Sequence, residues 1–444
     1  MVWSGARGLA GGRGGAKRAA LSPLMSSDAP TSDSAPDPAE YGRELIRPTL
    51  GRRVKWRLET AAYVCFEAVL GLLPVAVVAR VGRGAGALAH AIVTKRRRIV
   101  ARNLRIALAG ERTADELRAL TAEVFRRSGA NLLCSLRMVK MGERSLARAV
   151  VIRDEIVYRE AQAKGKGVVM VLAHMGNWEA LAQWFPKLLP PGVKGATVYR
   201  PLNNPMMNAR VVASRARRGV GLFSKDDNPL GMAGFLRRGG VLGVLADQRA
   251  GKIGELVPFF GRTTSCTPIP AILARRTGAA VVGVSLRTVG AGRWEMGFHA
   301  LGEGEPSTAG VMGLVERVMR ESMADVFWLQ DRWRVDRSRP HLPAGKAPRG
   351  DAPTPSKLRR VLLWREAIGG EADAALPTPP RAVPDDVVYE TAERSEGEGI
   401  EAFLRRVDAA DALPLDYVVG GGANAELRKA CRALGIGWVG GVKK

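Results

Sequence analysis

The chain has 444 residues, of which 46% are hydrophobic and 25% charged, so it can bury a large core and hold more than one globular unit. Its formal net charge is +25, and the surplus lies in the first 350 residues, because residues 351–444 carry 13 Lys and Arg against 15 Asp and Glu. This charge favours polyanionic partners, namely nucleic acid, an anionic membrane, or acidic carriers and phosphorylated substrates. The four scattered cysteines argue against a disulfide framework and a zinc site, and indicate a reduced, cytoplasmic setting.

The first segment, residues 1–45, is rich in Gly, Ala, Ser, Pro and Asp and has no hydrophobic period. This composition predicts a disordered segment. No apolar core of a signal peptide precedes the polar stretch, which argues against secretion.

Residues 46–110 are predicted to form a membrane-associated helical segment. Within it, residues 61–79 are the most hydrophobic stretch of the chain, with a length of about 19 residues near the lower limit for crossing a bilayer. Positive residues flank both ends, so they set no orientation. A single transmembrane helix, a helix or hairpin lying in the cytoplasmic interface, and a buried soluble helix all remain open. The basic cluster Lys95, Arg96, Arg97, Arg98 and Arg102 suits anionic headgroups.

Residues 113–138 are predicted to be helical. Thr113 is the expected N-cap, and Glu116 completes a capping box three residues later. Apolar residues then recur at helical spacing, so we expect this helix to cover the central sheet.

The segment over residues 167–189 carries the main chemical signal. Residues 168–173 are a continuous apolar run, which predicts a strand buried on both faces, and a helix is expected over residues 180–189. His174 and Glu179 lie at the junction, and Asn177 is a candidate N-cap. A carboxylate there can hold the imidazole in one tautomer, which leaves the other ring nitrogen to take a proton from a hydroxyl. The alternative is a core histidine and an ordinary first-turn glutamate.

Three further apolar runs, at residues 196–199, 241–246 and 279–286, alternate with helical segments at 208–218 and 270–277. This alternation predicts an α/β fold with a mainly parallel central sheet flanked by helices. His174, Arg200 and Asp247 follow three of the strands, at the edge where open α/β sheets bind ligands. An ion pair between Arg200 and Asp247 that only braces the strand ends is the alternative.

The tail follows a Pro/Gly-rich stretch at residues 341–356, which predicts a linker. Strands at 361–364 and 417–419 and a helix at 425–434 predict a small α/β appendage over residues 357–444. Glycines 420–422 form either a plain turn or a phosphate-binding loop.

Several of these segments together resemble the bacterial lipid A biosynthesis acyltransferases, the late lauroyl/myristoyl transferases of the lysophospholipid and glycerophosphate acyltransferase superfamily. The resemblance covers about residues 50–340. The closing segment departs from the family, which usually has a His–Arg–Arg type run where this chain has Gln330, Asp331 and Arg332. The matching segments are KRRRIVARNLRIAL (95–108), HMGNWE (174–179), VYRPLNNP (198–205), LADQR (245–249), VPFFGR (257–262) and WLQDRWR (328–334).

The resemblance implies a glycerophosphate-acyltransferase-like catalytic domain over residues 111–340, at the inner membrane and facing the cytoplasm. It implies transfer of a fatty acyl chain from acyl carrier protein or acyl-CoA to a hydroxyl of an anionic glycolipid, a lipid A precursor, without a metal or bound cofactor. His174 would be the general base and Glu179 would orient it, while backbone N–H groups near Gly176 and Asn177 are candidates for binding the oxyanion. The remaining expected substrate-binding residues are Arg200, Asp247, Gln248 and Arg262.

Other interpretations of the sequence keep the chemistry or replace it. A phosphatidylinositol-mannoside-like, aminolipid or lysophospholipid acceptor fits the same His–Glu pattern. The charge alone would also fit a nucleic-acid-binding protein, but the chain has no recognition motif of that class, so no nucleic-acid partner is expected. An inactive membrane scaffold whose tail recruits a partner is the third alternative.

Overall fold

The computed structural model describes residues 49–334, 345–349, 352–364, 386–420 and 424–439. The predicted disordered segment 1–45, residues 341–344 and 350–351 of the predicted linker, and two of the three glycines at 420–422 lie outside these residues.

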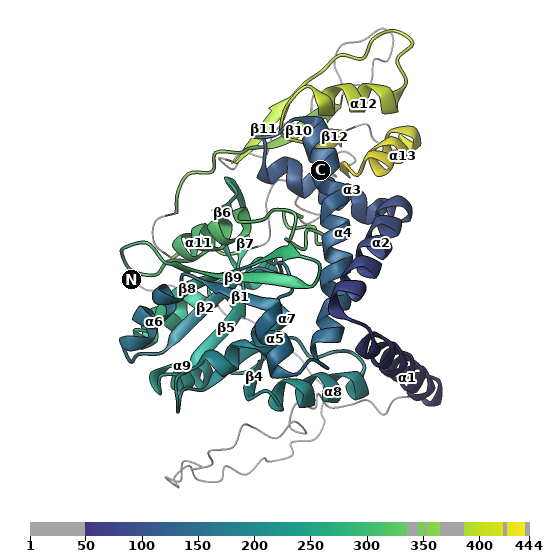
Figure 1. Ribbon diagram of the computed structural model, residues 1–444. Helices are drawn as coiled ribbons and strands as arrows, with labels where there is room; N and C mark the ends of the chain where they lie inside the picture. Colours follow the sequence, from purple (N-terminus) through teal and green to yellow (C-terminus); the bar gives the residue numbers. More distant parts are fainter. Residues whose placement is uncertain (1–48, 335–344, 350–351, 365–385, 421–423, 440–444) are drawn as a thin grey trace, which may run out of the picture. The chain divides into compact units, whose positions relative to one another are not determined.

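A seven-stranded sheet forms the centre of the fold (Figure 1). The strands from β8 to β4 are parallel, β9 is antiparallel to β8, and β1 is parallel to β9. All five residues of β2 are buried, as expected for an apolar run that is covered on both faces. The predicted mainly parallel α/β sheet is therefore confirmed. In sheet order the strands are β1 (Val150–Arg153), β9 (Arg293–Ala300), β8 (Ala280–Gly290), β2 (Val168–Leu172), β5 (Val241–Leu245), β3 (Gly195–Tyr199) and β4 (Val220–Ser224).

Helices flank this sheet. α4 (Ala114–Met138) begins with the predicted capping box, in which Thr113 and Glu116 satisfy each other's backbone N–H groups. α10 and α11 pack on β2 and β8, and α9 packs on β5. The bounds of these three helices are Pro229–Arg237 for α9, Ile269–Thr277 for α10 and Thr308–Arg320 for α11. The other helices around the sheet are α5 (Glu143–Ala149), α6 (Glu155–Ala163) and α8 (Pro205–Ala216).

The apolar stretch at residues 61–79 is not one continuous helix. α1 (Leu50–Leu72) ends before Pro74, and α2 (Val75–Ile92) begins after it, because proline lacks the N–H that a helix interior needs and its ring clashes with the preceding turn. Among the described residues, α2 is the one helix with the length and apolarity to cross a membrane, a test that the core helix of a soluble protein also passes. α3 (Thr94–Ala107) follows directly.

α2 runs side by side with α4 (Figure 1), and glycines form the contact. A Cβ atom added to Gly86 would lie 2.1 Å from the Phe125 carbonyl oxygen, and one added to Gly129 would lie 2.3 Å from the Gly82 oxygen. The two helix backbones therefore approach closely enough to exclude any side chain at these positions.

We expect Gly86→Ala to lower the free energy of unfolding by about 1–3 kcal/mol, the usual cost of overpacking a tight contact. Gly84→Ala is the matched control on the same helix, since a Cβ there meets nothing within 4 Å. It should stabilise the protein by up to about 1 kcal/mol through helix propensity. Urea unfolding followed by circular dichroism measures both changes, and equal changes of one sign would contradict the described α2–α4 contact.

A second, four-stranded parallel sheet lies near the end of the chain, and we call its strands β10 to β13 the C-terminal sheet. Its order is β11-β10-β12-β13, and the predicted helix 425–434 is present as α13. The elements are β10 (Arg359–Trp364), β11 (Val387–Glu390), α12 (Ile400–Ala409), β12 (Leu415–Gly420), α13 (Ala425–Leu434) and β13 (Gly437–Val439).

Arginines hold the C-terminal sheet against the rest of the protein. Asp416 on β12 is fully buried and pairs with Arg102 of α3 and with Arg262. Arg98 donates to the carbonyl oxygens of Arg432 and Ala433 at the end of α13, where the helix dipole favours a cation. The expectation that Arg98 and Arg102 serve anionic headgroups is therefore wrong, because both side chains bind within the chain.

Candidate active site

Neighbouring strands bring His174 and Asp247 together. β2 and β5 are parallel and in register, with Leu172 opposite Leu245, and each functional residue follows two positions later. The Nδ1 atom of His174 lies 2.8 Å from an Asp247 carboxylate oxygen. A carboxylate accepts only, so Nδ1 carries the proton and Nε2 is left as the acceptor.

The two side chains change each other's pKa. Burial disfavours the imidazolium of His174, but the Asp247 charge and hydrogen bond outweigh burial and raise the pKa of His174 above its ordinary value. Burial likewise opposes ionisation of Asp247, yet the imidazolium, its hydrogen bonds and the nearby Arg332 lower the pKa of this carboxyl. The pair is thus an ionised carboxylate beside an imidazole of enhanced basicity.

Glu179 has a different partner from the one predicted. Its two carboxylate oxygens accept hydrogen bonds from Arg215 of α8, at 3.3 and 3.1 Å. Glu179 is the first residue of α7 (Glu179–Gln183), and its carboxylate forms an ion pair with α8. Because Asp247 already occupies Nδ1 of His174, Glu179 is not its partner. The carboxylate that orients the imidazole in this structure is Asp247.

Gly176 and Asn177 shape the turn that follows His174. Gly176 has φ of +54°, a Cβ there would lie 2.2 Å from the Leu286 carbonyl oxygen, and its N–H donates to the Asp325 carbonyl. Asn177 is fully buried and accepts a hydrogen bond from the Ser135 hydroxyl. The predicted N-cap is also wrong, since Trp178 precedes α7 and no side chain caps it.

A cavity of about 890 Å³ opens beside this pair. His174, Glu179, Arg200, Arg215 and Gln248 contribute polar groups to its wall, and the Nε2 atom of Gln248 lies 3.4 Å from both ring nitrogens of His174. The structure therefore gathers an imidazole, a carboxylate, guanidinium groups and an amide around one space. Apolar side chains of β2, β3 and β5 form much of the remaining wall, among them Met170, Leu172, Val198, Val241 and Val244.

Arg262 is not among the residues of this wall. It is fully buried beside Asp416 and also donates to the Leu358 carbonyl, and burial lowers its pKa to about 10. The structure thus gives the arginine of VPFFGR a place under the C-terminal sheet, away from the predicted substrate-binding group.

Sequence reasoning missed Arg215 and Arg332. Arg215 lies within a predicted helix but no local pattern ties it to Glu179. Arg332 is buried, donates to Thr264 and contributes to the electrostatic environment of Asp247. It lies in the closing motif, which was the available signal. Within the described ranges, no group of three or more His, Cys, Asp or Glu side chains is arranged to hold a metal ion.

Comparison with known proteins gives a consistent family. The model of the bacterial lipid A biosynthesis acyltransferase family matches residues 52–335. The lipid A biosynthesis lauroyltransferase of Escherichia coli K12 is 26% identical over 59% of this chain and 87% of the relative, and the palmitoleoyltransferase of the same organism is 24% identical over the same shares. A phosphatidylinositol mannoside acyltransferase of Mycobacterium tuberculosis is 28% identical over 46% of this chain and 66% of the relative.

The family match over residues 52–335 includes every residue that lines the cavity. The relatives are all named as acyltransferases. The protein is accordingly an acyltransferase, and the chain belongs to the bacterial lipid A biosynthesis acyltransferase family.

Proposed function

We propose that this protein is a membrane-associated O-acyltransferase that moves a fatty acyl chain from acyl carrier protein or acyl-CoA to a hydroxyl of a lipid A precursor. The observation that carries the proposal is that His174, paired with Asp247, lies in the wall of a large, largely apolar cavity. A hydroxyl needs a base at this position, and an acyl chain needs apolar walls.

In the proposed reaction, Nε2 of His174 takes the proton of the acceptor hydroxyl as its oxygen attacks the thioester carbonyl carbon. A C–O bond forms, and the carbonyl oxygen carries the charge of the tetrahedral intermediate. The C–S bond then breaks, and the imidazolium returns its proton to the leaving thiolate. Asp247 stabilises the imidazolium throughout, as the carboxylate does in a catalytic triad.

The oxyanion requires a preorganised hydrogen-bond donor. The Gly176 N–H is already engaged by the Asp325 carbonyl, which removes it from the expected candidates. Gln248 supports this role better, because its side-chain nitrogen lies 3.4 Å from Nε2 of His174. We therefore assign Gln248 to the oxyanion or the acceptor hydroxyl.

Cationic side chains of the cavity wall fit an anionic acceptor. Arg200 is exposed there and can bind a phosphate oxygen in a bidentate manner. Arg215 is charge-balanced by Glu179, so Arg200 is the better candidate for the acceptor phosphate.

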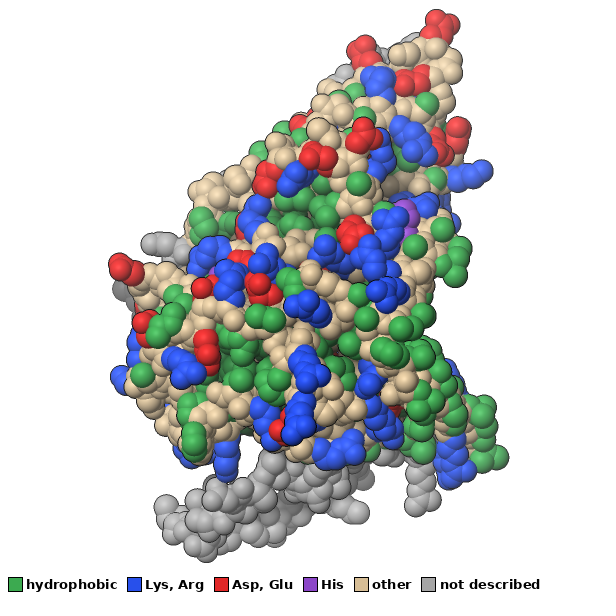
Figure 2. Space-filling view, in the orientation of Figure 1, with side chains coloured by type: hydrophobic (Ala, Val, Ile, Leu, Met, Phe, Trp, Pro, Cys, Tyr) green, Lys and Arg blue, Asp and Glu red, His purple; other side chains and the backbone are tan. Residues whose placement is uncertain are grey.

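The proposed attachment to the membrane rests on α1 and α2. Figure 2 shows hydrophobic side chains gathered over these helices, next to Lys and Arg side chains. Such a face can lie in the interface of an anionic bilayer. We propose the inner membrane, with the catalytic domain on the cytoplasmic side where acyl carriers are found. The exposed apolar side chains include Leu50, Leu58, Val69, Leu72, Val81, Leu88 and Ile92.

The proposal extends to the domain plan. We propose a glycerophosphate-acyltransferase-like catalytic domain over residues 111–340 that follows the helical segment 46–110. We further propose that residues 357–444 form a separate small α/β appendage. Its buried core of α12, α13, β10 and β12 side chains supports this division.

A second acceptor is supported by one relative. The similarity to a phosphatidylinositol mannoside acyltransferase favours that class of glycolipid as the alternative acceptor.

Membranes that contain the protein should be supplied with labelled acyl carrier protein or acyl-CoA and with each acceptor separately. The proposal predicts labelled lipid A precursor with one of the donors, and none with the His174→Ala variant. Labelled mannoside in place of lipid A precursor would move the proposal to the alternative acceptor, and label on neither would overturn it.

A further inference from the structure

The turn that carries His174 is held by a second segment of chain, residues 325–327. The Phe327 N–H donates to the His174 carbonyl at 2.7 Å, and the Gly176 N–H donates to the Asp325 carbonyl at 2.9 Å. Met175 and Val326 form the antiparallel bridge between these two bonds. The backbone position of His174 therefore depends on where residues 325–327 lie.

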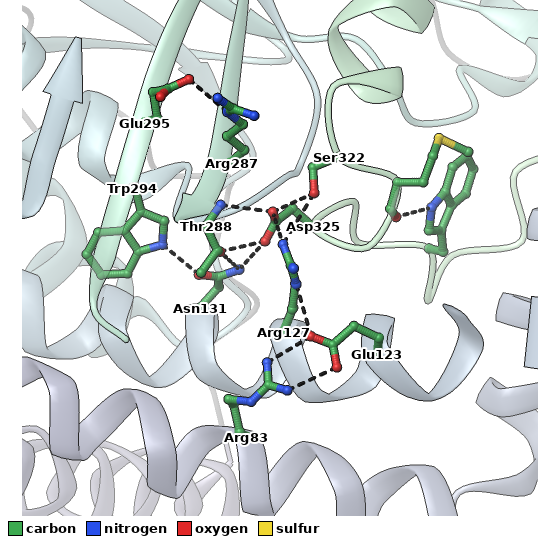
Figure 3. A network of polar contacts seen from close by, with 12 residues as sticks. Arg83, Glu123, Arg127, Asn131, Arg287, Thr288, Trp294, Glu295, Ser322 and Asp325 are labelled. Atoms are coloured by element: carbon green, nitrogen blue, oxygen red, sulfur yellow. Dashed lines mark hydrogen bonds and ion pairs between the residues drawn. The ribbon is translucent and has the colours of Figure 1, made fainter. Parts of the chain in front are cut away.

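The side chain of Asp325 fixes that segment. Its carboxylate accepts from Arg127 at 2.7 Å, from the Ser322 hydroxyl at 2.7 Å, and from the Thr288 N–H at 2.9 Å (Figure 3). The Thr288 hydroxyl and the Asn131 amide donate to the other oxygen. One buried carboxylate thus joins α4, β8 and the segment after α11 at a single point.

The charge of Asp325 is what this arrangement requires. Its side chain is fully buried, and a buried carboxylate persists only where donors and a counter-charge replace water. Arg127 supplies the counter-charge, and burial, which would lower the Arg127 pKa, is outweighed by Asp325 and Glu123, so this pKa is raised. Arg83 extends the network by pairing with Glu123 (Figure 3).

Aromatic rings connect the same segment to the imidazole. The ring of Phe327 contacts Trp178 edge to face at 5.8 Å, and Trp178 contacts His174 at 5.3 Å. A shift of residues 325–327 would consequently move both the backbone of His174 and the ring that packs against its imidazole.

We propose that Asp325 is a positioning residue for His174. It acts through the backbone of residues 325–327 to hold the imidazole in its place in the cavity wall. The inference rests on the proposed function, because it takes His174 as the base. The Asp325 side chain contacts neither the imidazole of His174 nor the carboxylate of Asp247.

Asp325→Asn keeps the shape of the side chain and removes its charge. Its amide N–H groups would face groups that themselves donate, such as Arg127 and the Thr288 N–H, so these hydrogen bonds are lost. We expect kcat to fall by about 10²-fold, the scale of a displacement near 1 Å, with KM and the acid limb of the pH profile unchanged. Asp386→Asn is the matched control, since Asp386 is a buried aspartate paired with Arg359 in the C-terminal sheet. It should lower the melting temperature and leave kcat near the wild-type value.

Hydrogen exchange supplies a readout that needs no substrate. In Asp325→Asn, the amides of Gly176 and Phe327 should lose protection at a temperature where both variants are folded, while Asp386→Asn retains it. Lost protection together with lost kcat supports the proposal. Unchanged protection in Asp325→Asn, or an equal loss of kcat in both variants, overturns it. If the wild type transfers no acyl group, the exchange result still decides the structural role, so that failure belongs to the proposed function alone.

Discussion

His174→Ala should lower kcat/KM for acyl transfer by about 10²–10⁴-fold, the usual contribution of a general base. The loss follows because His174 is the one histidine among the described residues that line the cavity. Measurement of initial rates with a labelled thioester donor checks the result, and circular dichroism establishes that the variant is folded.

His299→Ala is the matched control for this variant. The His299 side chain is as exposed as that of His174, at 19% each, but it contacts Ser285 and Glu321 outside the cavity wall. Its kcat/KM should stay within about threefold of the wild type. Equal losses in the two histidine variants would attribute the effect of His174→Ala to folding.

Asp247→Asn should be the second large change, with a loss in kcat of up to about 10⁴-fold, as observed when the triad aspartate of serine proteases is replaced by asparagine. The pH profile should move as well. Neutral imidazole is the active form, and Asp247 raises the pKa of His174, so the wild-type acid limb of kcat/KM lies above pH 6.5. Without the charge, the pKa falls and the limb shifts to lower pH.

Glu179→Gln separates the two carboxylates. Glu179 is paired with Arg215 and does not contribute to the pKa shift of His174. Its replacement removes the charge that pairs with Arg215 in the cavity wall and should lower kcat/KM. The acid limb of the pH profile should stay in place, because Asp247 still sets the pKa of His174. A downward shift of the limb in Glu179→Gln, with no shift in Asp247→Asn, would restore the partner that the sequence predicted.

The sequence predicts which strand ends carry the site, but its prediction that Glu179 is the partner of His174 differs from the structure, in which that partner is Asp247. His174, Arg200 and Asp247 were all expected at the carboxyl edge, and β2, β3 and β5 follow in that order along the chain. In the sheet, however, β5 lies between β2 and β3, so Asp247 is the neighbour of His174. Strand order depends on contacts distant in sequence, which periodicity and spacing do not report.

Two helix ends had a local signal. Pro74 divides the apolar stretch 61–79 between α1 and α2, and Pro186 lies where the predicted helix 180–189 becomes α7 and a short 3₁₀ turn, Phe185–Leu188. In both places the run of apolar residues or their helical spacing continued across the proline. The backbone cost of proline decided the structure.

Other differences had no local signal. In the sequence, Arg102 belongs to a basic cluster that suits anionic headgroups and Arg262 is expected to bind substrate, yet both bind Asp416, more than 150 residues further along the chain. A basic residue stays available to a ligand only when no acidic residue of the same chain pairs with it. The sequence alone does not show which distant acidic residue will do so. The α/β class with a mainly parallel sheet flanked by helices, by contrast, follows from local apolar runs and caps, and this part of the prediction is confirmed.

The most direct test of Asp247 as the partner of the base is an NMR titration of the His174 imidazole in the wild type and in Asp247→Asn and Glu179→Gln, with its signal assigned by its absence from His174→Ala. We expect a pKa above 6.5 in the wild type, a clearly lower pKa in Asp247→Asn, and a value close to the wild type in Glu179→Gln. A pKa that is unchanged in Asp247→Asn and lowered in Glu179→Gln would contradict the assignment of Asp247 as that partner.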